Sequence, residues 1–203
     1  MRATPWSLSA LAPLLITACA STPIRYHTLV PSLGNSPSVH SSTYRLGERI
    51  KVEEVSVPSE VDRSELVVRQ PDGGVTLWEN HLWLAPLPEE VKAALLAEMQ
   101  QRLALTPQSD RNAIAPWVSL RIDIARFEAV PGRYAAIEAN WELRVRGRYE
   151  LALSCRTSAY EDVGSGAAAL VRGQQRAIIL LADQISESVE QFARGAALEC
   201  PAT

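Results

Sequence analysis

The sequence predicts an α+β fold, in which a mostly antiparallel sheet carries two amphipathic helices packed on one face. After Gly47 the chain alternates between apolar and polar residues, as half-buried strands do, and two later stretches change to the spacing of helices. With 203 residues, the chain is long enough for one domain of ordinary size. We therefore expect residues 48–203 to form a single α+β domain.

The first expected strand is Ile50–Val57, in which apolar and polar residues alternate. Two shorter apolar runs follow at 66–69 and 75–78. Between them stands Gln70-Pro71-Asp72-Gly73-Gly74, and a Pro-Asp-Gly-Gly run between apolar stretches is a turn signal. These runs therefore predict a β-hairpin.

Three later runs also alternate with period two, at 118–124, 137–145 and 149–155. Pro131-Gly132 and Gly147 lie between them, at positions where turns are expected. The three runs predict an antiparallel meander, with one face on the core and the other face in water or paired.

Helical spacing begins after Pro88, where Glu89 and Glu90 are expected to be solvated acids that place favourable charge at a helix N-terminus. Pro107 marks the end of this helix, and a second helix is expected over residues 166–194. The apolar positions expected to face the core are Val91, Leu95, Met99 and Leu103 in the first helix, and Ile178, Leu181, Ile185, Val189 and Phe192 in the second.

The N-terminus carries a short apolar segment, Leu8–Ile16, that leads into Thr17-Ala18-Cys19. It is too short to span a bilayer, which requires about 20 apolar residues. The segment resembles a bacterial lipoprotein signal, which implies removal of residues 1–18 and attachment of acyl chains to Cys19. The alternative is an ordinary secretory signal with an incidental cysteine. Ala20 stands where an aspartate would indicate inner-membrane retention, so the outer membrane is favoured.

Residues 19–47 are rich in Ser, Thr, Pro, Gly and Asn, and they predict a flexible, lipid-anchored tether that lets the domain reach a distant partner. One short strand at about 24–29 is expected to join the edge of a sheet. His27 and His40 fall within this tether. We expect both to be exposed linker residues without a function.

Cys155 and Cys200 are an even pair once Cys19 is acylated. No metal-binding partner residues stand near them in the sequence. Because the periplasm is oxidising, the pair predicts a disulfide. Two buried free thiols are the alternative.

The net charge of −3 and the absence of a Lys/Arg cluster interleaved with aromatic residues argue against nucleic acid binding. The sequence contains no zinc-protease, serine-hydrolase or phosphate-loop motif, so we expect no catalysis, no metal and no cofactor. A periplasmic hydrolase remains an alternative. It would depend on His81, the one histidine outside the expected tether.

Two segments, Val57–Arg69 and Asn80–Leu87, carry a resemblance to a known family. They are followed in order by Phe127-Glu128, by a strand with Trp141, and by Gly164-Ser165-Gly166 before the final helix. Behind a lipoprotein signal, this order resembles the PqiC-type ABC-transport auxiliary lipoproteins over roughly residues 24–192.

The chain departs from that family pattern at two places. Ser64-Glu65 stands where Pro-Gln is usual, and Ala85 stands where an acidic residue is common. These differences bear on the detailed contacts of one loop and not on the overall resemblance.

The resemblance implies an outer-membrane lipoprotein on the periplasmic face of the envelope, forming a homo-oligomer. Its implied partners are an MCE-domain periplasmic protein with its permease and ATPase, which together conduct phospholipids or other hydrophobic molecules. A structural or assembly-factor lipoprotein without a role in lipid transport is the alternative.

Four residues of the resembling segments are candidates for partner binding: Asp62, Arg63, His81 and Trp83. Asp62-Arg63 is either a partner-facing ion pair or a turn in which Asp62 bonds backbone amides. Trp83 is either an exposed interface anchor or a core residue. His81 either contacts a partner or bonds locally.

Overall fold

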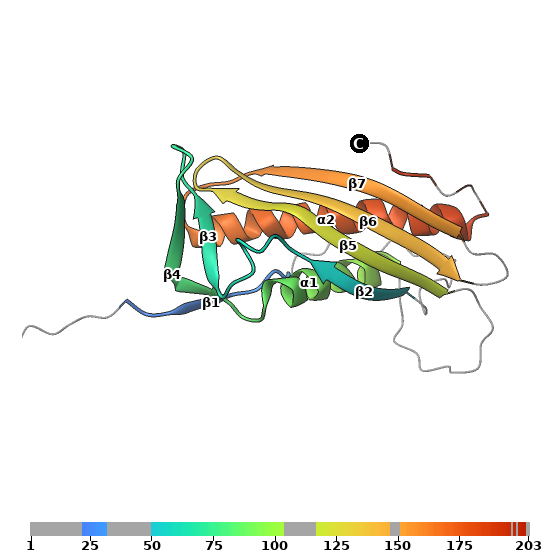
Figure 1. The fold of residues 1–203 in the computed structure, drawn as a ribbon, viewed down its shortest axis with the longest axis horizontal. Helices are drawn as coiled ribbons and strands as arrows, with labels where there is room; N and C mark the ends of the chain where they lie inside the picture. Colours follow the sequence, from blue (N-terminus) through green and yellow to red (C-terminus); the bar gives the residue numbers. More distant parts are fainter. Residues whose placement is uncertain are drawn as a thin grey trace, which may run out of the picture.

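The computed structural model describes residues 22–31, 50–103, 117–146, 151–195, 197 and 199–201. Along this part of the chain the elements run β1, β2, β3, β4, α1, β5, β6, β7 and α2, which confirms the α+β class (Figure 1). The predicted signal peptide 1–18, Cys19, His40, Pro107 and the turn near Gly147 lie outside the described residues.

A four-stranded sheet forms the larger layer, in the order β2 (Ile50–Ser56), β5 (Trp117–Val130), β6 (Tyr134–Arg146) and β7 (Leu151–Asp162). The last three strands are antiparallel neighbours, which confirms the predicted meander. The turn at Gly132, with φ of 69°, is also confirmed. β2 pairs with β5 in parallel, a pairing that the sequence pattern did not predict.

β5 is longer than the alternating run that predicted it. The register with β6 shifts between Ile124 and Arg126, so the strand contains a bulge at this point. Both Ala125 and Arg126 then lie away from the core, and Phe127 returns to it with 7% exposure. A bulge shifts the inside–outside alternation by one residue, which is why the strict period ended at 124 while the strand continues.

A second sheet holds three strands in the order β1 (Arg25–His27), β4 (Val75–Trp83) and β3 (Glu65–Arg69). The predicted hairpin between β3 and β4 is confirmed, since the Gln70 N–H donates to the Gly74 carbonyl over 2.7 Å. β1 pairs in parallel with the end of β4 and lies at the edge of this sheet, where the sequence places a short strand. The expected single sheet is therefore wrong, because the strands divide into two sheets with one parallel pair in each.

Both predicted helices are confirmed, as α1 (Leu87–Arg102) and α2 (Ala167–Ala193). They pack on each other and lie on the same side of the large sheet, with α1 beside β2 and α2 across β5, β6 and β7 (Figure 1). Gly173 permits close packing of α2, because a Cβ there would lie 2.2 Å from Cγ1 of Val163. All of the predicted core positions are buried except Phe192, which is half-buried.

A polar link ties the meander to α2 inside this core. The indole N–H of Trp141 donates to the hydroxyl of Thr157 over 3.0 Å, and that hydroxyl donates to Gln184 over 2.6 Å. Trp141 is only 2% exposed, so the bond satisfies the polar group of a large buried side chain.

The segment that follows β1 is fastened to both helices. Leu29 is fully buried, and the side chain of Gln175 on α2 donates to the carbonyl of Thr28 over 3.0 Å. Glu90 on α1 accepts hydrogen bonds from the Thr28 hydroxyl and from the Leu29 N–H, over 2.7 and 2.8 Å. The segment around the strand expected at about 24–29 thus contacts the domain, and Val30, placed in the expected loop, also packs against the core. Residues 20–24 separate Cys19 from β1.

Glu90 corrects a further expectation, because it is not a solvated acid. Its side chain is 4% exposed and also accepts a hydrogen bond from the Ala85 N–H over 3.1 Å. The position lies three residues after Leu87 and four before Ala94, both fully buried, so helical spacing places Glu90 on the core face. Glu89, one residue earlier, is exposed as expected.

Candidate functional site

The loop between β2 and β3 carries two of the predicted partner-binding residues. The N–H groups of Val61 and Asp62 both donate to the carbonyl of Pro58, over 3.0 and 3.2 Å, which makes this loop a turn. Asp62 and Arg63 are exposed. The ion pair of Arg63 is formed with Glu65, at 3.8 Å, rather than with Asp62. Both predicted residues are thus available to a partner at the surface.

Trp83 does not lie at the surface. It is 5% exposed and packs edge-on against Phe127, with ring centroids 6.2 Å apart. Its backbone N–H donates to the carbonyl of Ser64 over 2.7 Å, so it fixes the loop that bears Arg63. The interpretation of Trp83 as an exposed anchor is wrong, because the side chain fills the core beneath this loop.

His81 is half-buried and bonds to another histidine. Its Nδ1 lies 2.9 Å from Nε2 of His27, and the ring of Trp78 lies 5.6 Å away between centroids. Burial lowers the pKa of His27, and the nearby His81 and Arg25 lower it further. The expectation that His27 is an exposed linker residue is therefore wrong. Neither His27 nor Trp78 carries a hydroxyl or thiol that a histidine base could activate.

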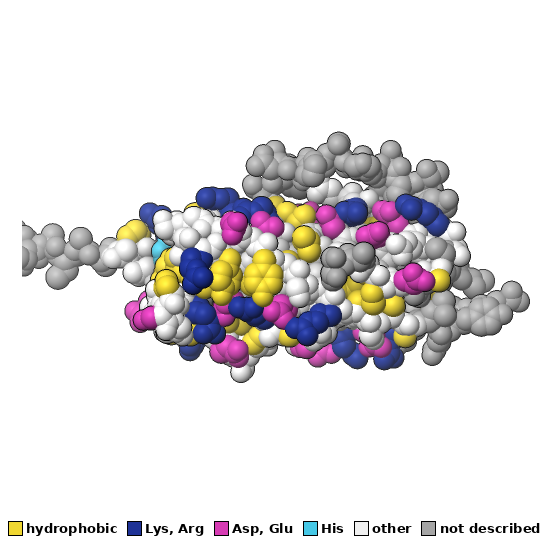
Figure 2. Space-filling model, turned by 90° about the horizontal axis from the view of Figure 1, so that it is seen from above, with side chains coloured by type: hydrophobic (Ala, Val, Ile, Leu, Met, Phe, Trp, Pro, Cys, Tyr) yellow, Lys and Arg dark blue, Asp and Glu magenta, His cyan; other side chains and the backbone are white. Residues whose placement is uncertain are grey.

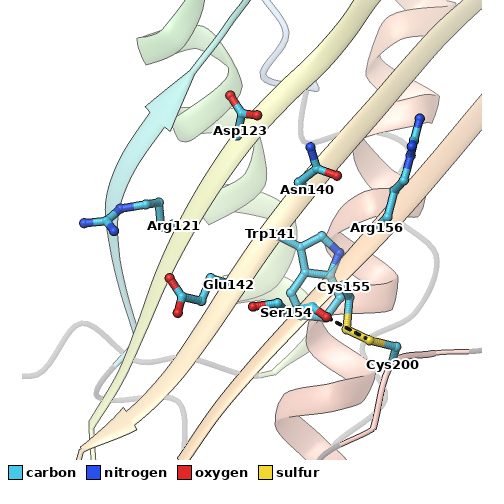
Figure 3. Close-up of a pocket in the computed structure, with 9 residues that line it drawn as sticks. All are labelled: Arg121, Asp123, Asn140, Trp141, Glu142, Ser154, Cys155, Arg156 and Cys200. Carbon is cyan, nitrogen blue, oxygen red and sulfur yellow. Dashed lines mark hydrogen bonds between the residues drawn. A yellow bond between two sulfur atoms is a disulfide. The ribbon is translucent and has the colours of Figure 1, made fainter.

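The face of the large sheet opposite the helices carries a shallow, open depression of about 500 Å³ (Figure 3). At its floor and rim the charged residues are engaged by neighbours: Arg121 pairs with Glu54 at 3.2 Å, and Asp123 accepts a hydrogen bond from Ser56 over 2.6 Å. The residues that line it are Arg121, Asp123, Asn140, Trp141, Glu142, Ser154, Cys155, Arg156 and Cys200.

A disulfide borders this depression at the outer strand of the sheet. Cys155 lies in β7, and the structure joins it to Cys200 beyond the end of α2 (Figure 3). The bond holds the C-terminal segment against the large sheet. It is the pairing that the count of cysteines predicts.

Farther along the same face, Arg126 organises a polar network. Its guanidinium bonds Glu128 at 2.6 Å, Glu138 at 3.2 Å and the Tyr160 hydroxyl at 2.6 Å. The hydroxyl of Tyr134 donates to Glu128 over 2.6 Å, and further arginines bond the same two carboxylates. Those arginines are Arg69 on Glu128 and Arg156 on Glu138.

The electrostatics of this network keep both acids charged. Burial raises the pKa of Glu128, but hydrogen bonds from Tyr134, Arg126 and Arg69 outweigh it and lower the pKa overall. Hydrogen bonds from Arg156 and Arg126 lower the pKa of Glu138. Such carboxylates are poor proton donors near neutral pH, so the network acts as a set of ion pairs. Figure 2 shows acidic and basic side chains beside one another across the visible surface.

The sequence analysis did not identify this network. The alternation of strands predicted a polar face, and the register of β5 with β6 pairs Arg126 with Glu138 directly. The bulge that brings Arg126 opposite Glu138 arises in the pairing of β5 with β6, which the sequence pattern alone does not show. The residues of the described ranges contain no group of three or more metal-ligating side chains, and none of their helices is long and apolar enough to cross a membrane.

Comparison with solved structures shows the fold. A crystal structure of an uncharacterized protein superposes with a TM-score of 0.64 at 16% identity, covering 83% of this chain and 99% of the other. A crystal structure of a Xanthomonas campestris protein of the DUF330 family gives a TM-score of 0.55 at 16% identity, with 84% and 95% covered. No curated protein matches the chain.

The fold and the surfaces described above define a two-sheet α+β protein with a loop and a polar sheet face open to partners. The sequence profile of the ABC-type transport auxiliary lipoprotein component matches residues 32–186. The chain belongs to this family, which confirms the resemblance carried by Val57–Arg69 and Asn80–Leu87.

Proposed function

We propose that this protein is an outer-membrane accessory subunit of an ABC-driven lipid transport system, and that it docks without catalysis on a periplasmic conduit of MCE-domain proteins. The observation that carries the proposal is the family match over residues 32–186, since the family comprises auxiliary components of ABC-type transport. The predicted acylation of Cys19 supplies the anchor, because two or more acyl chains hold a protein stably on a membrane. Assembly as a homo-oligomer is part of the proposal.

The loop that carries Asp62 and Arg63 is the proposed contact with the conduit protein. The backbone of this loop is held in place, because Val61 is only 6% exposed and the carbonyl of Ser64 accepts a hydrogen bond from the Trp83 N–H. A pre-ordered loop loses little conformational entropy on binding, which favours its use as a docking surface.

The ion pairing of the sheet face supports a binding role over a catalytic one. Glu128 and Glu138 are held charged by arginines, and His81 bonds His27 instead of a nucleophile. A general acid requires a carboxyl group that keeps its proton near neutral pH, and a nucleophilic hydroxyl or thiol requires a base within hydrogen-bonding distance.

Crosslinking in native membranes followed by affinity purification of the tagged full-length chain tests the proposal. We expect to recover an MCE-domain protein together with a permease and an ATPase. The double substitution Asp62→Ala and Arg63→Ala should reduce recovery about tenfold, whereas Arg172→Ala, at an exposed position of α2, should not. Recovery of other envelope proteins without a transport system would instead indicate a structural role.

A further inference from the structure

Three large apolar side chains are exposed together at one end of the small sheet. Ile24, Tyr26 and Leu84 are 56%, 62% and 66% exposed. Tyr26 stands opposite Leu82 in the parallel pairing of β1 with β4, and the Leu84 N–H donates to the carbonyl of His27 over 2.8 Å. The three residues therefore belong to adjoining segments at one end of the small sheet.

Strand geometry places these side chains on a single face. Alternate residues of a strand point to opposite faces, so Tyr26 and its partner Leu82 share the face opposite Trp83. Ile24 and Leu84 each stand one residue beyond the end of a strand, two positions from Tyr26 and Leu82. Trp83 points to the opposite side and is buried in the core. The face that bears the exposed side chains is therefore directed away from the protein interior. We call Ile24, Tyr26 and Leu84 the N-terminal apolar patch.

The position of the patch relative to Cys19 is limited by chain length. Five residue steps from Cys19 to Ile24 span at most about 18 Å, even when fully extended. Beyond Ile24 there is little freedom, because β1 pairs with β4 and Glu90 and Gln175 hold Thr28. In Figure 2, hydrophobic side chains are visible where the described chain begins, beside a histidine.

We propose that the N-terminal apolar patch inserts into the headgroup region of the same lipid bilayer that holds the acyl chains of Cys19. The inference rests on the lipidation that is part of the proposed function. Tyrosine is favoured at membrane interfaces, where its ring is buried and its hydroxyl stays hydrated. The patch would then fix the orientation of the domain on the membrane, with the β1 end facing the lipid.

A fluorescent probe on a single cysteine tests this placement. Cys19 is acylated and Cys155 is bridged to Cys200, so Leu84→Cys in the full-length lipidated chain supplies the one reactive thiol. The matched control is Val75→Cys, which is 58% exposed at the other end of β4. Each labelled protein is reconstituted in phosphatidylethanolamine and phosphatidylglycerol vesicles that contain lipids with a quencher near the headgroup.

We expect quenching at position 84 to exceed that at position 75 by about twofold or more. Tyr26→Cys serves as a second reporter and should behave like Leu84→Cys. Co-flotation with equal quenching at positions 84 and 75 would overturn the patch and leave the anchor intact. If the probe at position 84 became shielded from water only when a partner protein was added, the membrane contact of the patch would be overturned in favour of a protein contact. Failure to float with the vesicles would overturn the lipid anchor and the patch together.

Discussion

The carboxylate of Glu90 accepts a hydrogen bond of 2.8 Å from the backbone N–H of Leu29. The two residues are 4% and 0% exposed, so the bond lies inside the protein. Burial of a carboxylate is costly unless hydrogen bonds replace its hydration, and Thr28 and Ala85 supply two more. This contact joins the N-terminal segment to the first turn of α1.

Replacement of Glu90 by alanine should therefore destabilise the protein. We expect Glu90→Ala to lower the free energy of unfolding by about 3 kcal/mol, because the N–H groups of Leu29 and Ala85 lose their acceptor. Urea denaturation measures the change. The neighbouring Glu89 is exposed, so Glu89→Ala should change stability by less than about 0.5 kcal/mol, and equal effects of the two substitutions would contradict the structure.

The pair His27 and His81 predicts a loss of stability in mild acid. The pKa of His27 is lowered from its usual 6.5 by burial, by His81 and by Arg25, so the unfolded chain binds a proton more readily than the folded one. The contribution of His27 to the free energy of unfolding is therefore fully present above pH 6.5, and it is lost as the pH falls toward the lowered pKa.

Melting curves at about pH 7.5 and about pH 5.5 measure this effect. The melting temperature should fall at the lower pH for the unmodified chain. The fall should be smaller for His27→Gln, which keeps a polar side chain without a titrating group. An identical pH dependence of the two proteins would show that His27 does not contribute.

The disulfide between Cys155 and Cys200 should stabilise the fold strongly. It closes a loop with a sequence separation of 45 residues, for which chain entropy predicts about 4 kcal/mol. Denaturation with and without reductant measures the difference. Cys155→Ser combined with Cys200→Ser should match the reduced protein and be insensitive to reductant. Two reactive thiols in material from the periplasm would contradict the bond.

Ile185 of α2 lies in the core with no exposed surface. Ile185→Asp should destabilise the fold by more than about 4 kcal/mol, because an unpaired charge would be buried. Leu180 lies on the same helix at 37% exposure, so Leu180→Asp should be tolerated. Circular dichroism during urea titration compares the two variants, and tolerance of Ile185→Asp would contradict the burial of Ile185 in the core.

The lipid anchor is predicted from Cys19 alone. Cys19→Ser should yield a folded protein in the soluble periplasmic fraction, since acyl chains supply nearly all of the membrane affinity. Fractionation followed by immunoblotting measures the distribution. A substituted protein that stays with the membrane would contradict the lipoprotein signal.

Elements with strict periodicity could be predicted from the sequence. Val91, Leu95 and Met99 recur every four residues and are all buried on α1. The meander was predicted for the same reason, since β6 alternates without interruption from Ile137 to Val145. In both cases local spacing alone determines which side chains face the core.

Contacts between distant segments could not be predicted in this way. His27 and His81 are 54 residues apart, and they meet only because β1 pairs in parallel with β4. The bulge near Ala125 likewise depends on the pairing of β5 with β6. For Trp83 the sequence favours the core over an interface, since a tryptophan beside alternating leucines is usually buried, and the contact with Phe127 decides between the two.

The C-terminal segment has a consequence for association between copies of the chain. β7 is an outer strand of the large sheet, and the Sγ of Cys200 lies 3.4 Å from the carbonyl oxygen of Ser154 on that strand. The carbonyl of Glu199 accepts a hydrogen bond from Ser188 of α2 over 3.3 Å, which ties the segment to that helix. Unprotected outer strands recruit strands of other molecules and cause aggregation. The disulfide between Cys155 and Cys200 therefore shields part of β7 from pairing with strands of other molecules, and its reduction should make the protein more prone to aggregate.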